Sequence, residues 1–295
     1  MKIIECVPNF SEGRDSKKGQ ALVEVAAAVE GIKLLDFCMD EDHHRSVLTF
    51  IGPPGAVKDA CLAACRKALE IIDMCEHVGV HPRIGAVDVV PFIPLGDADM
   101  SDAVRIAHDF GREFSEQFQI PVYFYGEAAL TPSRRELSHI RKGGYEALNE
   151  RLKDPVWHPD IGPNLFNECT GATAVGARLP LIAFNINLKS DNLPLAQDIA
   201  RRIRQSSGGF PHVKAIGLLL RSRRVAQVSM NLTDYRVTSL RTVFDRVREE
   251  AARCNTDILE SELIGLIPRD ALADVTADYM KLKEFSDQKI LESHF

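Results

Sequence analysis

A loop in the first third of the chain contains a histidine and an arginine whose spacing suits acid–base chemistry on an anionic substrate. The imidazole of His81 has an ordinary pKa of about 6.5, so it can accept and return a proton near neutral pH. Pro82 disfavours helical backbone at His81, and Gly79 and Gly85 permit a tight loop against a partner or ligand. Arg83 adds a fixed positive charge. We interpret this loop as a candidate catalytic site; a structural loop with a surface histidine is the alternative.

A second polar cluster, from Asp36 to Arg45, is dense in carboxylates and imidazoles, which are ligands for divalent metal ions. Within it, Asp42-His43-His44 has the sequence of a motif found in metal-dependent phosphoesterases. The other motifs of those enzymes are not evident, and the segment from Gly208 to His212 does not replace them. The cluster leaves two interpretations open, a metal site that uses Asp40–His44 or a solvated acidic turn.

Three further patterns are weaker candidates. Gly171 and Gly176 have the spacing of a phosphate-binding loop, but Ala177-Arg178 stands where such a loop needs Lys followed by Ser or Thr. This excludes a nucleoside triphosphatase of that type, and no GxGxxG segment follows a predicted strand to support a dinucleotide fold. Cys61 and Cys65 lie on an apolar helical stripe, which predicts a place in the core rather than in a ligand site.

Two predicted strands carry polar side chains at every second position, so one face of each strand is polar. Asn185 and Asn187 alternate with apolar residues in the first of these strands. Gln227, Ser229 and Asn231 do the same in the second. Because buried amides need hydrogen-bonding partners, this face must meet water, a polar ligand or an opposing sheet.

The pattern of apolar residues predicts the elements that hold these groups. In the first half, we expect strands at 2–7, 32–38, 45–51, 86–94 and 121–126, and helices at 18–30, 55–74, 101–118 and 134–141. Ser133 and Glu136 have the spacing of a capping box for the last of these helices. This half therefore begins with a β-α-β-β-α-β order.

The same order returns in the second half, which predicts a duplicated unit. We expect strands at 180–188, 213–220, 225–231 and 257–266, and helices at 193–206 and 239–254. The predicted fold class is α/β of the α+β type, with two ferredoxin-like βαββαβ subdomains, facing mixed or antiparallel sheets and helices on the outer faces. The connector at 154–176 is rich in Pro and Gly and contains Trp157, which can pin it to a domain or line a cleft.

Composition places the chain among ordinary folded proteins and excludes several partners. Of its 295 residues, 26% are charged and 45% are hydrophobic. The net charge of −6 and the lack of a basic stripe interleaved with aromatic residues argue against nucleic acid. We find no signal-peptide core and no apolar run of about 18 residues, and we expect a cytoplasmic protein without membrane contact. The seven cysteines lack CxxC spacing, which predicts reduced thiols.

Five segments together resemble the formiminotransferase family, in the same order along the chain. They are Glu5–Gly13, His77–Leu95, Tyr123–Ala128, Asp160–Gly176 and Ala183–Leu188. The resemblance implies transfer of the formimino group from N-formimino-L-glutamate to tetrahydrofolate, the co-substrate, in histidine degradation and one-carbon metabolism. It also implies an N-terminal subdomain over residues 1–178, a C-terminal subdomain over residues 179–295 and a homodimer.

On matching positions, the resemblance implies that His81 is the catalytic general acid and base. Cys38 stands where mammalian members carry an aspartate that can partner the histidine, so Asp36 or Asp40 is expected to take that part. For substrate binding we expect the guanidiniums of Arg45, Arg83 and Arg178, with Asn185 and Asn187 as polar contacts. No metal is expected. The resemblance implies a folate-contacting loop made of Gly162, Pro163, Asn164, Leu165, Phe166, Asn167, Glu168, Cys169, Thr170 and Gly171.

Three other functions stay open. Some proteins that resemble this family handle 5-formyltetrahydrofolate, as a glutamate formyltransferase or a cyclo-ligase, and the missing phosphate-loop lysine disfavours the ATP-using form. A metal-dependent hydrolase at Asp40–His44 predicts bound Mn²⁺ or Zn²⁺. A non-catalytic folate-binding module predicts binding that is indifferent to loss of His81. The chain resembles the monofunctional form, without a cyclodeaminase domain, so a separate cyclodeaminase is expected downstream.

Overall fold

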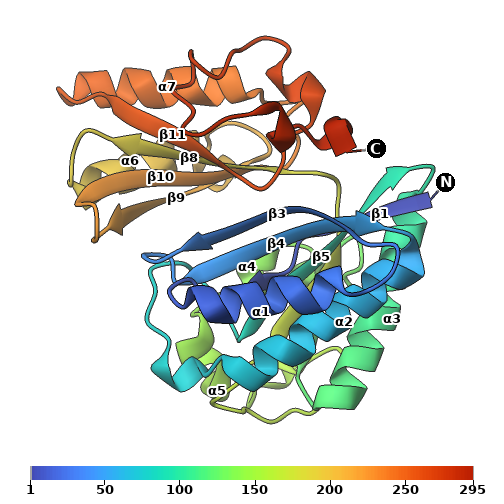
Figure 1. The fold of residues 1–295 in the computed structure, drawn as a ribbon. Helices are drawn as coiled ribbons and strands as arrows, with labels where there is room; N and C mark the ends of the chain where they lie inside the picture. The colour runs from blue at the N-terminus through green and yellow to red at the C-terminus, as the bar shows by residue number, and fades with distance from the viewer. Residues whose placement is uncertain (1, 295) are drawn as a thin grey trace. The chain divides into compact units, whose positions relative to one another are not determined.

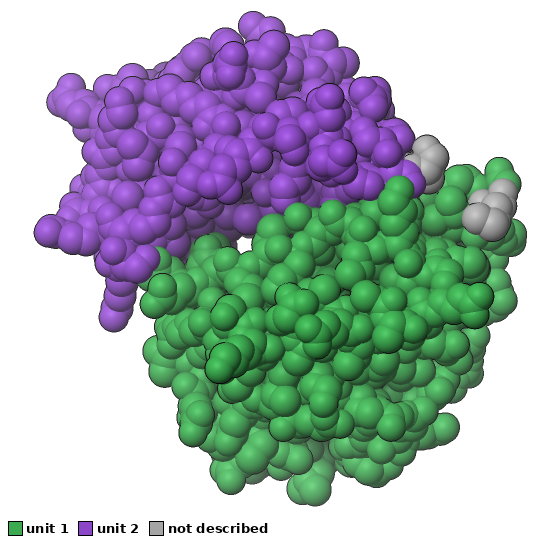
Figure 2. All heavy atoms as spheres, viewed as in Figure 1, with its two compact units in different colours: residues 1–178 green, residues 179–295 purple. Residues whose placement is uncertain are grey.

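The computed structural model describes residues 2–294, and the chain divides into two compact units. The first unit covers residues 1–178 and the second covers residues 179–295, as coloured in Figure 2. Each unit has its own sheet, helices and hydrophobic core. The mixed sheet of the first unit and the antiparallel sheet of the second confirm the predicted α+β class with two subdomains.

The first unit is built on a seven-stranded sheet. Its strands are β1 (Lys2–Cys6), β2 (Asn9–Phe10), β3 (Lys33–Asp40), β4 (Arg45–Gly52), β5 (Val87–Gly96), β6 (Val122–Gly126) and β7 (Thr173–Ala177). β1 lies between β4 and β5, and β3 pairs with β4, all of them antiparallel. β7 and β6 extend this βαββαβ sheet beyond β5 as parallel strands.

Three helices cover one face of this sheet: α1 (Ser16–Ala27), α2 (Pro54–Ile71) and α3 (Met100–Phe118). In Figure 1, α1 and α2 lie side by side across it. Local signals set the starts of these helices. Asp15 caps α1 through its side chain, a proline opens α2, and Asp99 with Asp102 forms a capping box at α3.

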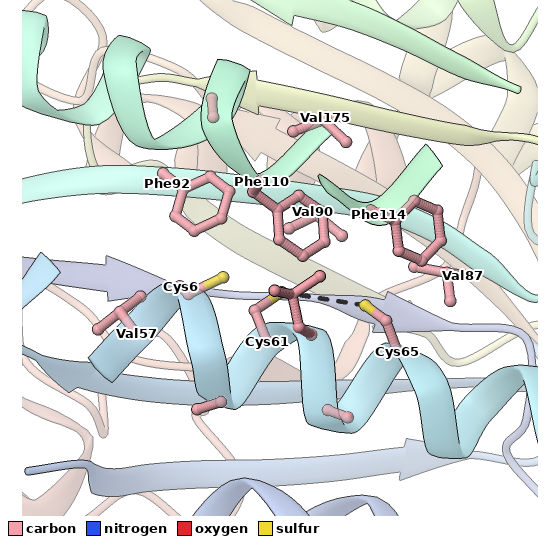
Figure 3. Packing of buried hydrophobic residues seen from close by; sticks show 14 of the residues in the cluster. Cys6, Val57, Cys61, Cys65, Val87, Val90, Phe92, Phe110, Phe114 and Val175 are labelled. Atoms are coloured by element: carbon pink, nitrogen blue, oxygen red, sulfur yellow. Dashed lines mark hydrogen bonds between the residues drawn. The ribbon is translucent and has the colours of Figure 1, made fainter. Parts of the chain in front are cut away.

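Aromatic rings and small apolar side chains fill the space between these helices and the sheet. Figure 3 shows Phe92 of β5 beside Phe110 and Phe114 of α3, with cysteines of β1 and α2 close by. Cys61 and Cys65 are fully buried with their sulfur atoms 3.9 Å apart, which confirms their predicted place in the core. Burial of such side chains stabilises the unit by about 1.5–3 kcal/mol for each large residue.

A smaller apolar cluster covers the opposite face of β5, β7 and β6. Alternate residues of β6 divide between the two faces: Val122 and Phe124 join the main core, whereas Tyr123 and Tyr125 join the smaller cluster. The short helices α4 (Leu137–Ile140) and α5 (Leu148–Arg151) contribute to its cover. This end of the sheet is therefore buried on both sides, as parallel strands require.

The structure corrects two expectations in this region. The segment at 154–176 is not a connector between the halves, because it lies within the first unit and leads into β7, between β5 and β6. The strand β7 escapes prediction because three of its five residues, Ala174, Gly176 and Ala177, have little β propensity. Ser133 and Glu136 form no capping box: a single 3₁₀ turn spans Pro132–Arg134, and α4 begins only after Glu136.

The second unit has the predicted β-α-β-β-α-β order. Its elements are β8 (Ile182–Leu188), α6 (Leu193–Ile203), β9 (Val213–Leu220), β10 (Val225–Leu232), α7 (Leu240–Arg253) and β11 (Ile258–Ile264). The strand order is β11-β8-β10-β9 with every pair antiparallel, which is the ferredoxin-like arrangement. Helices α6 and α7 pack on one face. Within residues 2–294, no helix combines the length and hydrophobicity that a bilayer-spanning segment needs.

Candidate functional site

The face of the first sheet that is turned away from α1, α2 and α3 carries polar side chains on β3 and β4. On β4, Leu48 joins the core, so Arg45 and Thr49 project from the other face. Antiparallel pairing places Asp40 directly opposite Arg45, and β2 brings Asn9 to the same face. These side chains form the floor of the candidate site.

The loop from His77 to Gly85 is held against the turn between β3 and β4. The rings of His44 and His77 stack with their centroids 4.3 Å apart, and Nε2 of His77 donates to the carbonyl oxygen of His44 at 2.8 Å. A Cβ atom on Gly79 would lie 2.4 Å from the carbonyl oxygen of His43. Only glycine fits at this position, and the backbone that it approaches is the turn between β3 and β4 of the same chain.

His81 is half-buried, and both of its ring nitrogens have partners. Nδ1 lies 2.8 Å from the carbonyl oxygen of Pro82, and Nε2 lies 2.9 Å from Nη1 of Arg45. Because a guanidinium only donates, Nε2 accepts and Nδ1 carries the proton. Burial, followed by the positive charges of Arg45 and Arg141, holds the pKa of His81 well below its usual value. The imidazole is therefore neutral at pH 7.

Arg45 is a cation without a carboxylate at ion-pair distance among residues 2–294. Its Nη1 donates to His81, its Nη2 donates to the amide oxygen of Asn9, and its buried Nε has no acceptor. Burial lowers the pKa of Arg45 to about 10, and the charge of Arg141 adds to this effect. A desolvated guanidinium with an unused donor and no counter-ion is suited to bind an anion.

The second guanidinium near this ring, that of Arg141, pairs with the carboxylate of Asp88 on β5, which is almost fully buried. The same carboxylate accepts a hydrogen bond from the backbone nitrogen of Ile84 at 2.9 Å, which fixes the end of the loop that carries His81. Arg141 and Asp88 are not selected from the sequence alone, because they stand 53 positions apart. The one indication in the sequence that Asp88 has a special role is that this aspartate stands within an otherwise apolar strand.

The carboxylates of Asp36 and Asp40 lie on β3, but neither one forms a hydrogen bond with a ring nitrogen of His81. Asp36 accepts from the thiol of Cys38 at 2.9 Å. Asp40 accepts from the backbone nitrogen of His43 at 2.7 Å and lies 3.8 Å from Nδ1 of that residue. The rings of His43 and His81 have centroids 5.6 Å apart. Asp40 is thus linked to His81 through His43, and the group that directly orients the catalytic candidate is a backbone carbonyl.

The turn at Asp40–His44 does not gather its side chains as metal ligands. His44 faces the carboxylate of Glu12 with its Nε2 at 3.4 Å, whereas His43 faces Asp40. In the part of the chain that the structure describes, no three ligand atoms of this turn converge on one point. The alternative of a metal-dependent hydrolase at this turn therefore lacks a ligand cluster.

The guanidinium of Arg83 forms hydrogen bonds with two side chains, those of His77 and Glu146. Its Nε donates to Nδ1 of His77 at 3.0 Å, and its terminal nitrogens lie 2.6 and 3.1 Å from the carboxylate oxygens of Glu146. Burial lowers the pKa of His77 to about 4, so this ring stays neutral and accepts from Arg83. Arg83 therefore stabilises the loop that carries His81 by linking His77 to Glu146.

Arg178 follows β7 and acts electrostatically on Glu5 and Tyr125. Burial raises the pKa of Glu5 to about 7, and the charge of Arg178 opposes this shift. Burial also raises the pKa of Tyr125, again opposed by Arg178. Because Cys6 belongs to the core, Glu5 projects to the same polar face as Arg45. The polar side chains on this face therefore include Glu5 of β1 as well as those of β3 and β4.

The loop at 162–171 adjoins the loop that carries His81. Gly171 forms a bridge with Gly85, and the backbone nitrogen of Ala86 donates to the carbonyl oxygen of Thr170 at 2.9 Å. A Cβ atom on Gly171 would lie 2.2 Å from the carbonyl oxygen of Ile84, and its φ of +67° favours glycine. Two segments that the sequence places 86 residues apart therefore share one edge of the site.

The outer part of this loop presents apolar surface. The side chain of Leu165 is 70% exposed, and Phe166 packs against Tyr145 with ring centroids 5.5 Å apart. Exposed apolar groups beside aromatic rings suit a flat, partly apolar ligand.

In the second unit, the amides of Asn185 and Asn187 are buried on the face of the sheet turned away from α6 and α7. Nδ2 of Asn187 donates to Glu260 at 3.1 Å and to Glu262 at 2.8 Å, and its Oδ1 accepts from Gln227 at 3.0 Å. The predicted polar face is confirmed. Its central amide is satisfied by neighbouring strands.

Comparisons with known proteins agree along the whole chain. Residues 3–178 match the family model described as "Formiminotransferase domain, N-terminal subdomain", and residues 183–293 match "Formiminotransferase domain". A glutamate formimidoyltransferase of Thermoplasma acidophilum is 44% identical over 99% of this chain and 97% of its own length. A glutamate formimidoyltransferase of Streptococcus pyogenes serotype M1 is 41% identical over 99% and 98%. The formimidoyltransferase-cyclodeaminase of Mus musculus is 45% identical over 94% of this chain, which spans 52% of that longer protein.

Proposed function

The chain belongs to the formiminotransferase family, and we propose that it transfers the formimino group from N-formimino-L-glutamate to tetrahydrofolate, giving 5-formiminotetrahydrofolate and L-glutamate. Two relatives of matching length that bear the name glutamate formimidoyltransferase support this proposal. Within the chain, the observation that carries it is the neutral imidazole of His81, whose Nε2 accepts from a guanidinium with no carboxylate partner among residues 2–294.

The reaction needs one proton to leave a nitrogen and one to arrive at another. N5 of tetrahydrofolate forms a bond to the formimino carbon and loses its proton. The bond from that carbon to the glutamate nitrogen then breaks, and the departing nitrogen takes the bonding electrons and gains a proton. One imidazole can perform both transfers, since the proton that it accepts from N5 is the one that it returns. We assign this part to Nε2 of His81.

Arg45 is our proposed ligand for a carboxylate of formiminoglutamate. A carboxylate is a stronger acceptor for a guanidinium than a neutral imidazole is, so substrate binding would draw Arg45 away from Nε2 of His81. The bound negative charge also offsets the cations that lower the pKa of His81. That pKa then rises towards the neutral range, where acid–base catalysis is most effective. Substrate binding would thus bring the pKa of His81 into the range that acid–base catalysis needs.

The remaining predicted residues divide by their surroundings. Arg178 stands at the polar face and is our second proposed carboxylate ligand. Arg83 acts as a brace of the loop through His77 and Glu146. Asp40 would influence His81 through His43, whose ring lies close to both. Asp36 lies on the same strand, β3, and forms no hydrogen bond with His81. Asn185 and Asn187 stay predictions as polar substrate contacts.

Tetrahydrofolate is our proposed ligand of the loop at 162–171. This loop adjoins the His81 loop through the bridge between Gly85 and Gly171. It exposes Leu165, and the next residue, Phe166, packs against the ring of Tyr145; such apolar and aromatic surface suits the flat pterin and benzoyl groups. The homodimer stays a prediction, and gel filtration of the purified protein tests it.

The direct test mixes the purified protein with tetrahydrofolate and formiminoglutamate, without ATP or added metal. Product is followed by absorbance after acid conversion to the methenyl form. We expect turnover in the wild type and a loss of about 10²–10⁴-fold in His81→Ala, because general acid–base catalysis contributes about that factor. The matched control is His158→Ala, which removes an exposed histidine from the same unit.

Each outcome separates the alternatives. Near-normal turnover by a folded His81→Ala variant contradicts the assignment of this residue. Turnover from 5-formyltetrahydrofolate in place of the formimino donor moves the chain to the formyl-folate branch of the family. Folate binding without turnover, unchanged in His81→Ala, indicates a binding module.

A further inference from the structure

Three exposed ligand-type side chains converge at the base of the loop at 162–171. The carboxylate of Asp73, the thiol of Cys75 and the thiol of Cys169 offer ligand atoms that all lie within 4.8 Å of one another. They come from two segments that are far apart in the sequence. Asp73 and Cys75 lie at a single 3₁₀ turn at Met74–Glu76, just before the His81 loop, and Cys169 lies near the end of the other loop.

Backbone hydrogen bonds hold these two segments together. The nitrogen of Met74 donates to the carbonyl oxygen of Cys169 at 2.9 Å, which keeps the backbones of Cys75 and Cys169 close to each other. The carboxylate of Asp73 accepts from the backbone nitrogen of Cys75 at 2.9 Å, and both thiols are directed at it. The nitrogen of Cys169 donates to the side-chain oxygen of Asn167 at 2.9 Å. The three groups are thus arranged before any ligand arrives.

We propose that Asp73, Cys75 and Cys169 bind one thiophilic divalent cation of the Zn²⁺ type, with water as the fourth ligand. Thiolate and carboxylate are ligands of Zn²⁺, with metal–sulfur bonds of about 2.3 Å and tetrahedral angles. Two sulfurs in such a site lie about 3.8 Å apart by this geometry, a small adjustment for exposed side chains that already lie within 4.8 Å. Binding releases one proton from each thiol, which leaves two thiolates and one carboxylate around the ion.

The alternative for two thiols this close is a disulfide between Cys75 and Cys169. A disulfide uses only the two thiols, whereas the cation also uses the carboxylate of Asp73, towards which both thiols are directed. The neighbouring side chains Glu76 and Glu168 add formal negative charge, which also favours a cation. The ion would tie the start of the His81 loop to the loop at 162–171. This proposal stands on the cluster itself and does not depend on the proposed function.

Cobalt is the probe, because Co²⁺ takes the place of Zn²⁺ and its bonds to thiolates absorb light. The reduced, chelator-treated protein is titrated with Co²⁺. We expect thiolate-to-cobalt absorption that saturates at one ion per chain and is abolished by Zn²⁺. Cys75→Ser and Cys169→Ser should each lose most of this absorption, and Asp73→Asn should bind more weakly by at least about tenfold. Cys254→Ser, which changes an exposed cysteine of the second unit, should bind as the wild type does.

Two results would overturn the proposal. One is the absence of stoichiometric cobalt–thiolate absorption in the reduced wild type. The other is absorption that persists in the double variant Cys75→Ser/Cys169→Ser. All three positions are exposed and serine is close in shape to cysteine, so thermal unfolding of the variants checks that the fold is unchanged. Failure of the transferase assay leaves this test intact, since its readout is metal binding.

Discussion

Replacement of Arg45 by glutamine tests the electrostatic reasoning about the site most directly. The guanidinium donates to Nε2 of His81 at 2.9 Å and also to Asn9, and no carboxylate among residues 2–294 pairs with it. If it binds the substrate carboxylate, Arg45→Gln removes a hydrogen bond between charged groups. Such bonds contribute about 1.5–3 kcal/mol, which corresponds to an increase of about 10- to 150-fold in the KM for formiminoglutamate.

The same substitution has a second, independent consequence for pH dependence. Burial and then the charges of Arg45 and Arg141 hold the pKa of His81 below its usual value. Removing one of these cations raises that pKa in the unliganded protein. A general base is active only when deprotonated, so the acid limb of kcat/KM moves to higher pH. Arg45→Lys keeps the charge and loses the planar pair of donors, so its KM should rise while the acid limb stays in place.

The assay measures initial rates over a range of formiminoglutamate concentrations at saturating tetrahydrofolate, from pH 5 to pH 9. Arg112→Gln is the matched control, because it removes an exposed arginine of α3 that pairs with Asp109. A KM for Arg45→Gln within twofold of the wild type, together with an unmoved acid limb, would refute both parts of the argument.

Three further predictions concern the supports of the site. Burial raises the pKa of Glu5 to about 7, so between pH 4.5 and pH 7 the unfolded chain ionises while the folded chain stays protonated. Urea unfolding should show the wild type losing about 3 kcal/mol of stability between pH 4.5 and pH 8 relative to Glu5→Gln; parallel curves would contradict this. Arg141→Met leaves the buried carboxylate of Asp88 unpaired, and denaturant titration should show a loss of about 3–5 kcal/mol; an unchanged midpoint argues against the ion pair. Gly79→Ala places a Cβ atom 2.4 Å from the carbonyl oxygen of His43, so the loop must shift. We expect a loss of about 10²-fold in kcat, and normal steady-state kinetics would show that the loop position is not critical.

Most elements of the fold follow from the sequence pattern. Helices such as α3 and α7 bury one apolar stripe, and this periodicity is visible without any tertiary information. The strand β7 is different. Its side chains are small, and it becomes a strand because β5 and β6 on either side supply its hydrogen bonds. The same holds for the two-residue strand β2, which no local pattern can predict.

The candidate site follows from the sequence only in part. The polar positions on β8 and β10 are predictable, because alternation in a strand assigns each residue to a face. The pairing of Arg141 with Asp88 is not, since 53 residues separate them and no local rule links them. The approach of the loop at 162–171 to the His81 loop likewise depends on where β7 enters the sheet.

The sequence by itself determined that His81 lies on a restricted loop, because Pro82 and the neighbouring glycines limit the backbone angles locally. Only the tertiary structure decided which cation faces the imidazole. Arg83, two positions away, turns to Glu146, whereas Arg45, 36 positions away, donates to Nε2. The physical reason is that backbone preferences act over a few residues. Contacts between distant side chains depend on strand register and on the face from which each residue projects.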